Sequence, residues 1–317
     1  MRFLVVGAGS WGTAFTRVLL DRGHGVVLAC RTPEQAKAIA QSGWNPRYLQ
    51  GVDLSAAEAV ALADAPDDAD VVVAAVPSSA FAEVVGSLPG TSPVLCLAKG
   101  LDPETGERLS TRVRGHPVAV LSGPNVAEEI AEGLPTAAVI ASEDGHLAGE
   151  LQHALNSGLF RAYVNPDVVG VELCAAAKNV IALAAGGVDG LGLGDNAKAS
   201  LIARGLAEMT RLGEAAGAQA ETFAGLAGIG DLVVSCCSTK TRNRRAGELI
   251  AQGLTPERAA AEIGQTVEGL TTAPVLRDLS HRLAVELPIT EGVCAVLAGQ
   301  SITDLAAGLM GREPTEE

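Results

Sequence analysis

The chain has 317 residues, 48% of them hydrophobic, 19% charged and only 3% aromatic, which predicts two globular domains with aliphatic cores. Its formal net charge of −14 argues against general affinity for nucleic acid or anionic lipid. An anionic small-molecule substrate would need a local cluster of arginine and lysine that reverses this potential.

Short apolar runs alternate with helical patterns in the first half of the chain. The runs are rich in valine and mostly apolar throughout, as is typical of strands buried on both faces of a parallel sheet. They lie at residues 3–6, 26–29, 71–75, 94–97, 118–121 and 137–140. Helical patterns lie between them at 11–21, 33–41 and 78–86. This alternation predicts a doubly wound α/β domain over residues 1–166.

The pattern changes after Asn165-Pro166 to long helical segments with few valine-rich runs. The expected helices span residues 168–186, 196–216, 255–263, 272–280 and 289–298. Glycine-rich stretches at 186–194 and 225–230 are expected to separate helices, and the polar tail at 311–317 to fray. Residues 167–317 are therefore predicted to form an all-α substrate domain, whose alanine and glycine content suits a homodimer.

The six cysteines are scattered, with no CxxC pair and no histidine at ligand spacing, so we expect neither a metal site nor a disulfide framework. Most should be small buried hydrophobic residues in a reducing compartment. A strand pattern follows Met1 directly, without a signal peptide, and no apolar run approaches the ~20 residues that span a bilayer. We expect a cytoplasmic protein without membrane insertion.

The first strand runs into a G-x-G-x-x-G motif that opens an amphipathic helix. Gly7 allows the tight turn, Gly9 removes a Cβ that would block a pyrophosphate, and Gly12 lets the helix pack closely. Free N–H groups at the start of the helix face the phosphates. The motif predicts a nicotinamide dinucleotide site; the alternative is a glycine-rich turn that binds no ligand.

The second strand ends at Arg31, where an NAD-preferring site usually places an acidic residue on the ribose hydroxyls. A guanidinium stacks on adenine and pairs with a 2′-phosphate. We therefore predict that NADP is accepted beside NAD; which of the two is preferred stays open. The alternative is a solvated surface arginine.

Polar residues follow two later strands of the predicted sheet. Lys99 comes directly after the fourth strand, and Gly123 and Asn125 follow the fifth. Because carboxyl ends of parallel strands face the ligand crevice, these residues are candidates for substrate contacts. Asn125 has a second interpretation as the cap of a helix that runs to residue 131.

Lys178 lies within an apolar helical pattern and cannot be a plain surface residue. Burial disfavours the ammonium form and lowers the pKa of a lysine, which then exchanges a proton with a carbonyl oxygen. Asp231, after a glycine-rich turn, would orient a substrate hydroxyl or hold Lys178 charged. The alternatives are a snorkelling lysine between the domains and a helix cap at Asp231.

The segment 241–245 reads Thr-Arg-Asn-Arg-Arg and is the local positive cluster that an anionic substrate requires. Arginine pairs bidentately with phosphate, and the neighbouring Thr241 and Asn243 add neutral donors beside Arg242. The alternative is a solvated helix face.

Taken in order, these motifs resemble the bacterial-type NAD(P)-dependent glycerol-3-phosphate dehydrogenases, and the resemblance covers essentially the whole chain. The segments that carry it are 7–12, 45–49, 98–101, 122–124, 178–182, 228–232, 242–245 and 267–269. It implies a Rossmann-type sheet followed by a helical domain, and reversible reduction of dihydroxyacetone phosphate to sn-glycerol 3-phosphate for phospholipid synthesis.

The resemblance also implies roles for individual residues. Lys178 would be the proton donor and acceptor, with Asp231 beside it in the catalytic site. The cofactor would be lined by Ser10, Trp11, Arg31, Lys99, Ala127, Arg242 and Glu268, besides the three glycines of the turn. The substrate would contact Lys99, Gly123, Asn125, Lys178, Asp231, Thr241, Arg242 and Asn243.

Two positions depart from the family pattern. Asn125 stands where members often have serine, and Thr241 stands where many have serine. An amide can still donate to substrate and the hydroxyl is kept at Thr241, so both roles are expected to survive. Two further functions stay open: a β-hydroxy acid or phosphogluconate-type dehydrogenase with a similar Lys-Asn pair, and a dinucleotide sensor without catalysis.

Overall fold

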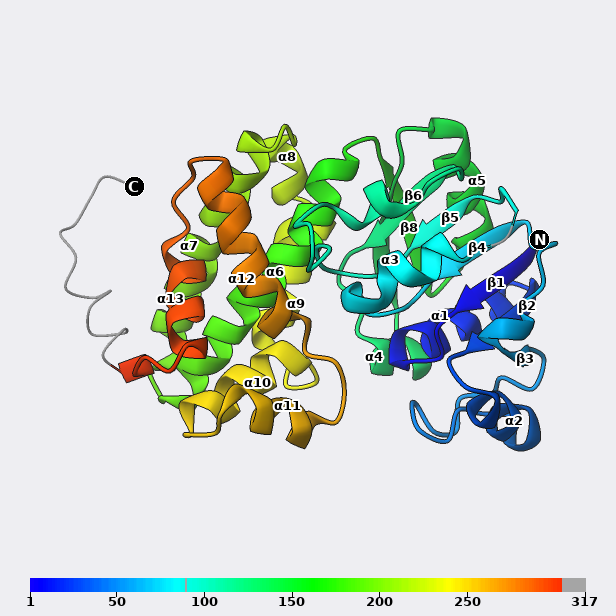
Figure 1. Cartoon of the computed structure of the whole chain (residues 1–317), viewed down its shortest axis with the longest axis horizontal. Helices are drawn as coiled ribbons and strands as arrows, with labels where there is room; N and C mark the ends of the chain where they lie inside the picture. Colours follow the sequence, from blue (N-terminus) through cyan, green and yellow to red (C-terminus); the bar gives the residue numbers. More distant parts are fainter. Residues whose placement is uncertain (89, 304–317) are drawn as a thin grey trace.

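The computed structural model describes residues 1–88 and 90–303, so the tail at 311–317 lies outside the described residues. An α/β half and a helical half lie side by side (Figure 1). The described strands all lie before residue 166, and the helices of the second half begin at residue 168. The predicted fold class, a Rossmann-type sheet followed by a helical domain, is confirmed.

One eight-stranded sheet forms the core of the first half. Its order is β3-β2-β1-β4-β5-β6-β7-β8, and all neighbours are parallel except β6 and β7. The strands are β1 (Arg2–Val6), β2 (Gly25–Cys30), β3 (Glu58–Ala61), β4 (Val71–Ala74), β5 (Val94–Cys96), β6 (Val118–Ser122), β7 (Thr136–Ala141) and β8 (Phe160–Asn165). The first six strands have the order typical of dinucleotide-binding domains.

The sequence pattern missed both edge strands and the direction of β7. In β3 and β8 exposed or partly exposed residues are interspersed with buried ones, so neither shows the continuous apolar run of a central strand. β7 was expected in a parallel sheet, but it pairs antiparallel with β6 and parallel with β8. Strand direction depends on the path of the connection, which an apolar run does not record.

Helices cover both faces of the sheet, and its two faces belong to different cores. Phe3 and Val5 of β1 pack into a core confined to the first half, whereas Leu4 and Val6 join a core that continues into the helical half. The helices of this half are α1 (Ser10–Asp21), α2 (Pro33–Ser42), α3 (Ser78–Gly86), α4 (Ala127–Ala131) and α5 (Gly145–Leu155). Residues of the two halves therefore share one apolar core.

The second half is built around α6 (Val168–Gly190). Around it lie α7 (Gly194–Ala215), α8 (Ala220–Phe223), a π-helical turn at Leu226–Gly230, α9 (Asp231–Cys237), α10 (Arg242–Ala251), α11 (Pro256–Ile263), α12 (Glu268–Arg282) and α13 (Pro288–Leu297). Thr255 caps α11 by accepting from the Arg258 N–H, as its position before Pro256 predicts.

Two helical stretches are long and apolar enough to cross a membrane by composition, contrary to the expectation from the sequence. One is α6, with a mean hydropathy of 1.7, and the other is Ala220–Cys237, with 1.3. The apolar window of α6 is 89% buried within the protein, which identifies it as a core helix; the second window is 44% buried.

Glycines that were expected to break a helix instead lie inside α6 and pack against α10. A Cβ at Gly186 would lie 1.8 Å from the carbonyl oxygen of Arg244, and one at Gly247 would lie 1.9 Å from that of Leu183. The two backbones thus touch directly, which no other residue type permits. This contact fixes α10, and with it the segment 241–245, against the helix that carries Lys178.

Candidate active site

The glycine turn has the geometry that a dinucleotide site requires. Gly7 has a φ of +110°, and a Cβ at Gly12 would lie 1.9 Å from the carbonyl oxygen of Gly7, so the helix packs onto the turn itself. A Cβ at Gly9 would meet no atom within 4 Å, so this cradle is left open by the protein. The buried amide of Asn45 donates to the carbonyl of Ala8 at 2.9 Å and holds the turn.

Arg31 lies directly after β2 and is exposed. Its guanidinium forms no hydrogen bond or ion pair with the rest of the described chain, so it is available to a ligand. Trp11 lies at the start of α1, packs edge-on against Phe15 and has a buried indole N–H without a partner among the described residues. Ala127 is the buried first residue of α4.

Lys99, Lys178 and Asp231 form a charge cluster between the two halves, in which Lys178 and Asp231 are buried and Lys99 is partly buried. Lys178 Nζ donates to one carboxylate oxygen of Asp231 at 2.6 Å, and Lys99 Nζ donates to the other at 2.8 Å. Lys99 also donates to the carbonyl of Gly123 at 2.9 Å. Asp231 is only 1% exposed and Lys178 6%. The site thus joins the ends of β5 and β6 to α6 and α9.

The pKa values in this cluster are shifted in a way that suits proton transfer. Burial lowers the pKa of Lys178 to about 8, Asp231 opposes that shift, and Lys99 adds to it. Burial alone would raise the pKa of Asp231, but the two ammonium groups lower it below its usual range. The carboxylate therefore stays ionised while Lys178 exchanges a proton near neutral pH.

A chain of amide groups connects this cluster to α10 and α12. Asn179 Nδ2 donates to the carbonyl of Lys99 at 3.2 Å, and Asn243 Nδ2 donates to Asn179 Oδ1 at 2.8 Å. The Gly269 N–H donates to Asn243 Oδ1 at 2.9 Å. Four segments distant in the sequence are thus held in one arrangement, which brings Asn243 close to the lysine cluster.

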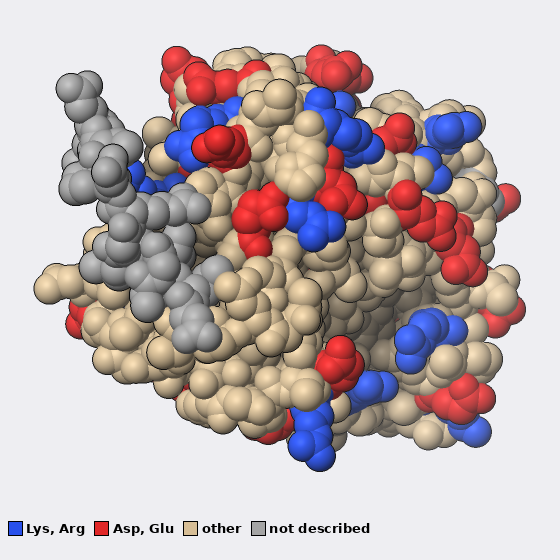
Figure 2. Space-filling model, turned by 60° about the vertical axis from the view of Figure 1, so that its left-hand side comes forward, with Lys and Arg blue, Asp and Glu red and all other residues tan. Residues whose placement is uncertain are grey.

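Only part of the predicted positive cluster is free. Arg244 pairs with Asp189 at 2.6 Å, and Arg245 pairs with Glu248 at 3.3 Å, so carboxylates neutralise both. Arg242 forms no ion pair within 4 Å with a described residue. On the face shown in Figure 2, blue and red side chains are interspersed instead of forming a broad basic patch. Of the three arginines in the segment 241–245, Arg242 alone is left without an ion pair to a described residue, and it is the arginine predicted to contact substrate.

Two hydroxyl groups, those of Thr241 and Ser235, lie between α10 and the lysine cluster. The Thr241 hydroxyl lies within donating distance of the carbonyls of Ser235 and Ser238, at 2.7 and 2.8 Å, so it is engaged within its own loop. Ser235 Oγ accepts from Lys178 Nζ at 2.8 Å. Sequence reasoning missed Ser235, although its place one helical turn after Asp231 puts both side chains on one face of α9.

Two polar contacts bridge the halves beside the glycine turn. Glu268 accepts from the N–H and the hydroxyl of Ser78 at 3.1 and 2.5 Å, and Ser10 Oγ donates to Gln265 at 3.1 Å. Burial raises the pKa of Glu268. The predicted cofactor residues Ser10 and Glu268 thus take part in contacts between the two halves. Their partners, Gln265 and Ser78, belong to no sequence motif, so the sequence did not reveal them.

Asn125, in the turn after β6, has one of the two roles considered for it from the sequence excluded by the structure. The N-cap of α4 is Val126, without a side-chain hydrogen bond, so the alternative interpretation of Asn125 as the cap of this helix is wrong. Asn125 Nδ2 instead donates to the carbonyl of Ala137 at 3.0 Å, which ties the turn to β7.

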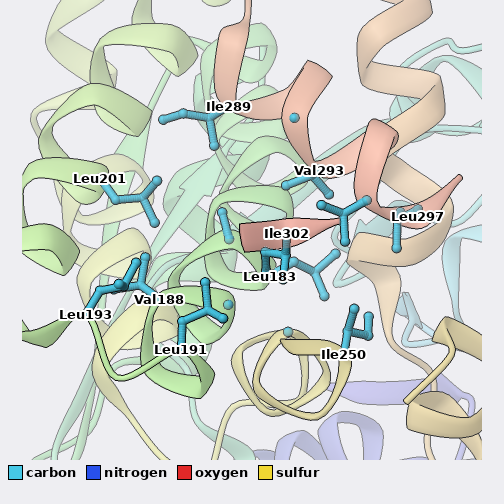
Figure 3. A pocket seen from close by; sticks show the side chains of 15 residues that line it. Leu183, Val188, Leu191, Leu193, Leu201, Ile250, Ile289, Val293, Leu297 and Ile302 are labelled. Carbon is cyan, nitrogen blue, oxygen red and sulfur yellow. The ribbon is translucent and has the colours of Figure 1, made fainter. Parts of the chain in front are cut away.

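A hollow of about 100 Å³ in the helical half has a different character. Its walls are aliphatic side chains of α6, α7, α10 and α13, and Ile302 points into it (Figure 3). Its lining holds no titratable or nucleophilic group, so it is not part of the charged site.

Five of the six cysteines are buried, as predicted, and only Cys237 is exposed.

Comparisons with known proteins agree over the whole chain. Residues 3–148 match the family described as NAD-dependent glycerol-3-phosphate dehydrogenase N-terminus, and residues 167–306 match its C-terminus. A glycerol-3-phosphate dehydrogenase (NAD(P)+) of Moorella thermoacetica is 45% identical, over 99% of this chain and 96% of that protein. One from Shigella boydii serotype 18 is 43% identical over 99% and 96%.

Solved structures give the same result. The crystal structure of glycerol-3-phosphate dehydrogenase from Coxiella burnetii has a TM-score of 0.94 at 36% identity and covers 98% of this chain and 99% of that chain. A 2-dehydropantoate 2-reductase from Methylococcus capsulatus has a TM-score of 0.62 at 12% identity, over 99% of both chains, and shares the fold alone.

Proposed function

The chain belongs to the NAD-dependent glycerol-3-phosphate dehydrogenase family, and we propose that Lys178 is its proton donor and acceptor. The protein is an oxidoreductase that uses NAD or NADP to interconvert dihydroxyacetone phosphate and sn-glycerol 3-phosphate. The observation that carries the residue assignment is the buried Lys178 ammonium, 2.6 Å from the carboxylate of Asp231. The family match over both halves of the chain favours this function over the β-hydroxy acid or phosphogluconate-type alternative.

The proposed chemistry follows from the charge cluster. In the direction of reduction, the Lys178 ammonium donates a proton to the substrate oxygen at C2 and keeps its place through Asp231 and Ser235. In the reverse direction the neutral amine accepts that proton. A positioned proton donor typically accelerates such a step by ~10²–10⁴-fold. Lys99 adds a second positive charge beside the carboxylate.

Arg242 would hold the phosphate of the substrate. One of its N–H groups donates to the carbonyl of Thr266 at 2.9 Å, which fixes the guanidinium while other N–H groups remain for an anion. Asn243 adds a side-chain amide at the start of α10, and Thr241 directly precedes Arg242 in sequence. Binding energy gathered at the phosphate would position C2 against Lys178.

The open cradle at Gly9 fits a dinucleotide, because the protein leaves that space free beside the start of α1. When bound, the nicotinamide supplies the hydride. The residues that would hold the cofactor are Gly7, Gly9, Ser10, Trp11, Gly12, Arg31, Lys99, Ala127, Arg242 and Glu268. The exposed Arg31 supports a preference for NADP over NAD.

The organisation of the protein adds further proposals. We place the domain boundary between residues 166 and 167, since β8 ends at Asn165 and α6 begins at Val168. The alanine- and glycine-rich helices of the second half, which allow close helix contacts, support a homodimer. Six free thiols suit the cytoplasm, where the enzyme would supply glycerol phosphate for phospholipid synthesis.

The decisive test is oxidation of NADPH on addition of dihydroxyacetone phosphate, followed by absorbance. Lys178→Met should lose turnover by at least ~10²-fold while it still binds NADPH, as followed by tryptophan fluorescence. Lys37→Met, an exposed lysine on α2, is the control and should keep wild-type rates. Wild-type turnover in Lys178→Met would refute the assignment.

A further inference from the structure

The chain that follows Lys99 forms a hairpin at residues 101–108. Leu101 and Arg108 face each other in an isolated antiparallel bridge at its base. Asp102, which is 3% exposed, closes the turn by accepting from two backbone N–H groups within it. Because Lys99 lies two residues before the bridge, the position of this hairpin determines where the backbone of Lys99 lies.

A buried carboxylate of the helical half holds the 101–108 hairpin. Glu172, on α6, is 4% exposed and accepts from the guanidinium of Arg108 at 2.9 Å. It also accepts from the N–H and the hydroxyl of Ser110 at 2.8 and 2.6 Å. The charged or titratable groups that face it are Arg108 and the Cys96 thiol of β5. A buried carboxylate without such donors is costly, so the hairpin and α6 are tied together here.

This contact closes a ring that contains both lysines of the charge cluster. Glu172 lies six residues before Lys178 on the same helix, a rise of about 9 Å. The 101–108 hairpin that it holds begins two residues after Lys99. Lys99 and Lys178 in turn bind the two oxygens of Asp231, at 2.8 and 2.6 Å. The separation of the two ammonium groups is thus constrained from two sides.

The role of Glu172 in the reaction must be indirect, because it forms no hydrogen bond to the charge cluster. We propose that Glu172 is a positioning residue, which holds the 101–108 hairpin on α6 and thereby keeps the Lys99 ammonium against Asp231. Asn179 assists by donating to the carbonyl of Lys99 at 3.2 Å. The inference rests on the proposed function and adds a residue that belongs to none of the sequence motifs.

The charges around Lys178 distinguish positioning from a direct electrostatic effect. The groups that face its ammonium are Asp231 and Cys236 of α9 and Lys99 of the α/β half; Asp231 raises the pKa of Lys178 and Lys99 lowers it. If Glu172 acts by holding Lys99, its loss moves a positive charge away and raises the pKa of Lys178. Direct removal of a negative charge would lower that pKa instead.

The test measures kcat for reduction of dihydroxyacetone phosphate from pH 6 to 10 in Glu172→Gln, which keeps the shape and removes the charge. The pH above which kcat falls should move upward, as in Lys99→Met, and kcat/KM at pH 7 should drop about 10- to 100-fold because the reacting groups are misplaced. A downward movement, or none, overturns the inference. If Glu172→Gln does not fold, Ser110→Ala removes one donor without changing a charge and should move the profile upward as well.

A second measurement separates positioning from a general loss of stability. In the Lys99→Met background the hairpin has no ammonium left to hold, so Glu172→Gln should lower kcat/KM by less than about threefold. A merely structural role would lower kcat/KM by the same factor in both backgrounds, which overturns the inference.

Glu208→Gln is the matched control, since it removes a carboxylate that is 3% exposed and lies on α7. It should keep the wild-type kcat/KM and pH profile. An effect equal to that of Glu172→Gln would show that loss of any buried carboxylate suffices, which also overturns the inference.

Failure of this inference is distinguishable from failure of the proposed function. If Lys99→Met moves the pH profile and Glu172→Gln does not, only the role of Glu172 is wrong. If kcat of the wild type does not fall at high pH, the assignment of Lys178 fails, and kcat/KM in the two backgrounds still decides the role of Glu172.

Discussion

Lys178 and Lys99 donate to different oxygens of one carboxylate, that of Asp231, at 2.6 and 2.8 Å. One negative charge is thus shared by two ammonium groups, so the cluster carries a net positive charge in a buried place. Lys99 comes from the α/β half and Lys178 from the helical half, so the arrangement exists only when the two halves pack together.

The pH dependence of turnover should follow Lys178. With a pKa of about 8, the ammonium form is lost as pH rises through that value, so kcat for reduction should fall above about pH 8. In the direction of oxidation the neutral amine is the active form, so kcat should rise through the same range. Two profiles with limbs in the same direction would contradict the assignment.

Lys99 should set the pH at which kcat for reduction falls, that is, the position of the descending limb of the pH profile. Its positive charge lowers the pKa of Lys178, so Lys99→Met should move the limb for reduction to higher pH, beside any loss of substrate affinity. Lys37→Met should leave the limb in place. The measurement is kcat at saturating substrate from pH 6 to 10, and a limb that moves to lower pH would show that Lys99 does not act through charge.

Arg242 and Arg245 lie one helical turn apart but differ in what they contact. Arg245 is paired with Glu248 and Glu262, whereas Arg242 has no ion pair with a described residue. Arg242→Ala should raise KM for dihydroxyacetone phosphate by about 10- to 100-fold, as expected for loss of a charged hydrogen bond, and Arg245→Ala should change it less than threefold. Equal effects with unphosphorylated dihydroxyacetone would argue against a phosphate contact.

The glycine contact between α6 and α10 should be essential for stability. Gly186→Ala would place a Cβ 1.8 Å from a backbone carbonyl, so we expect a loss of about 1–3 kcal/mol or more and displacement of α10. Gly149→Ala in α5 meets no atom within 4 Å and should stabilise by about 0.5–1 kcal/mol. Urea unfolding of both variants measures this, and similar effects would contradict the packing argument.

Glu208 on α7 should make stability depend on pH. It is 3% exposed and accepts from the N–H of Ile289 at 2.6 Å, at the start of α13, and burial raises its pKa from 4.5 to about 7. The unfolded chain ionises first as pH rises, so this group removes stability between about pH 4.5 and 7. Relative to the wild type, Glu208→Gln should lose less free energy of unfolding from pH 5 to 7; parallel curves would contradict this.

The sequence alone determined the fold class, because buried parallel strands read as continuous apolar runs and the glycine turn has a fixed spacing. It also identified Lys178 as a candidate, since a lysine in apolar surroundings is unlike a surface residue, and Asp231, which follows a glycine-rich turn. It did not show that they touch, because they are 53 residues apart and only the packing of α6 against α9 joins them.

Tertiary structure decided the features that depend on partners distant in the chain. Arg242 and Arg244 look alike in sequence, yet Asp189 at the end of α6 pairs with Arg244, whereas no carboxylate among the described residues pairs with Arg242. The glycines of α6 look like a break, yet α10 packs on them. Neighbours in space set the charge, burial and hydrogen bonding of each side chain, and a local pattern of residues does not contain those neighbours.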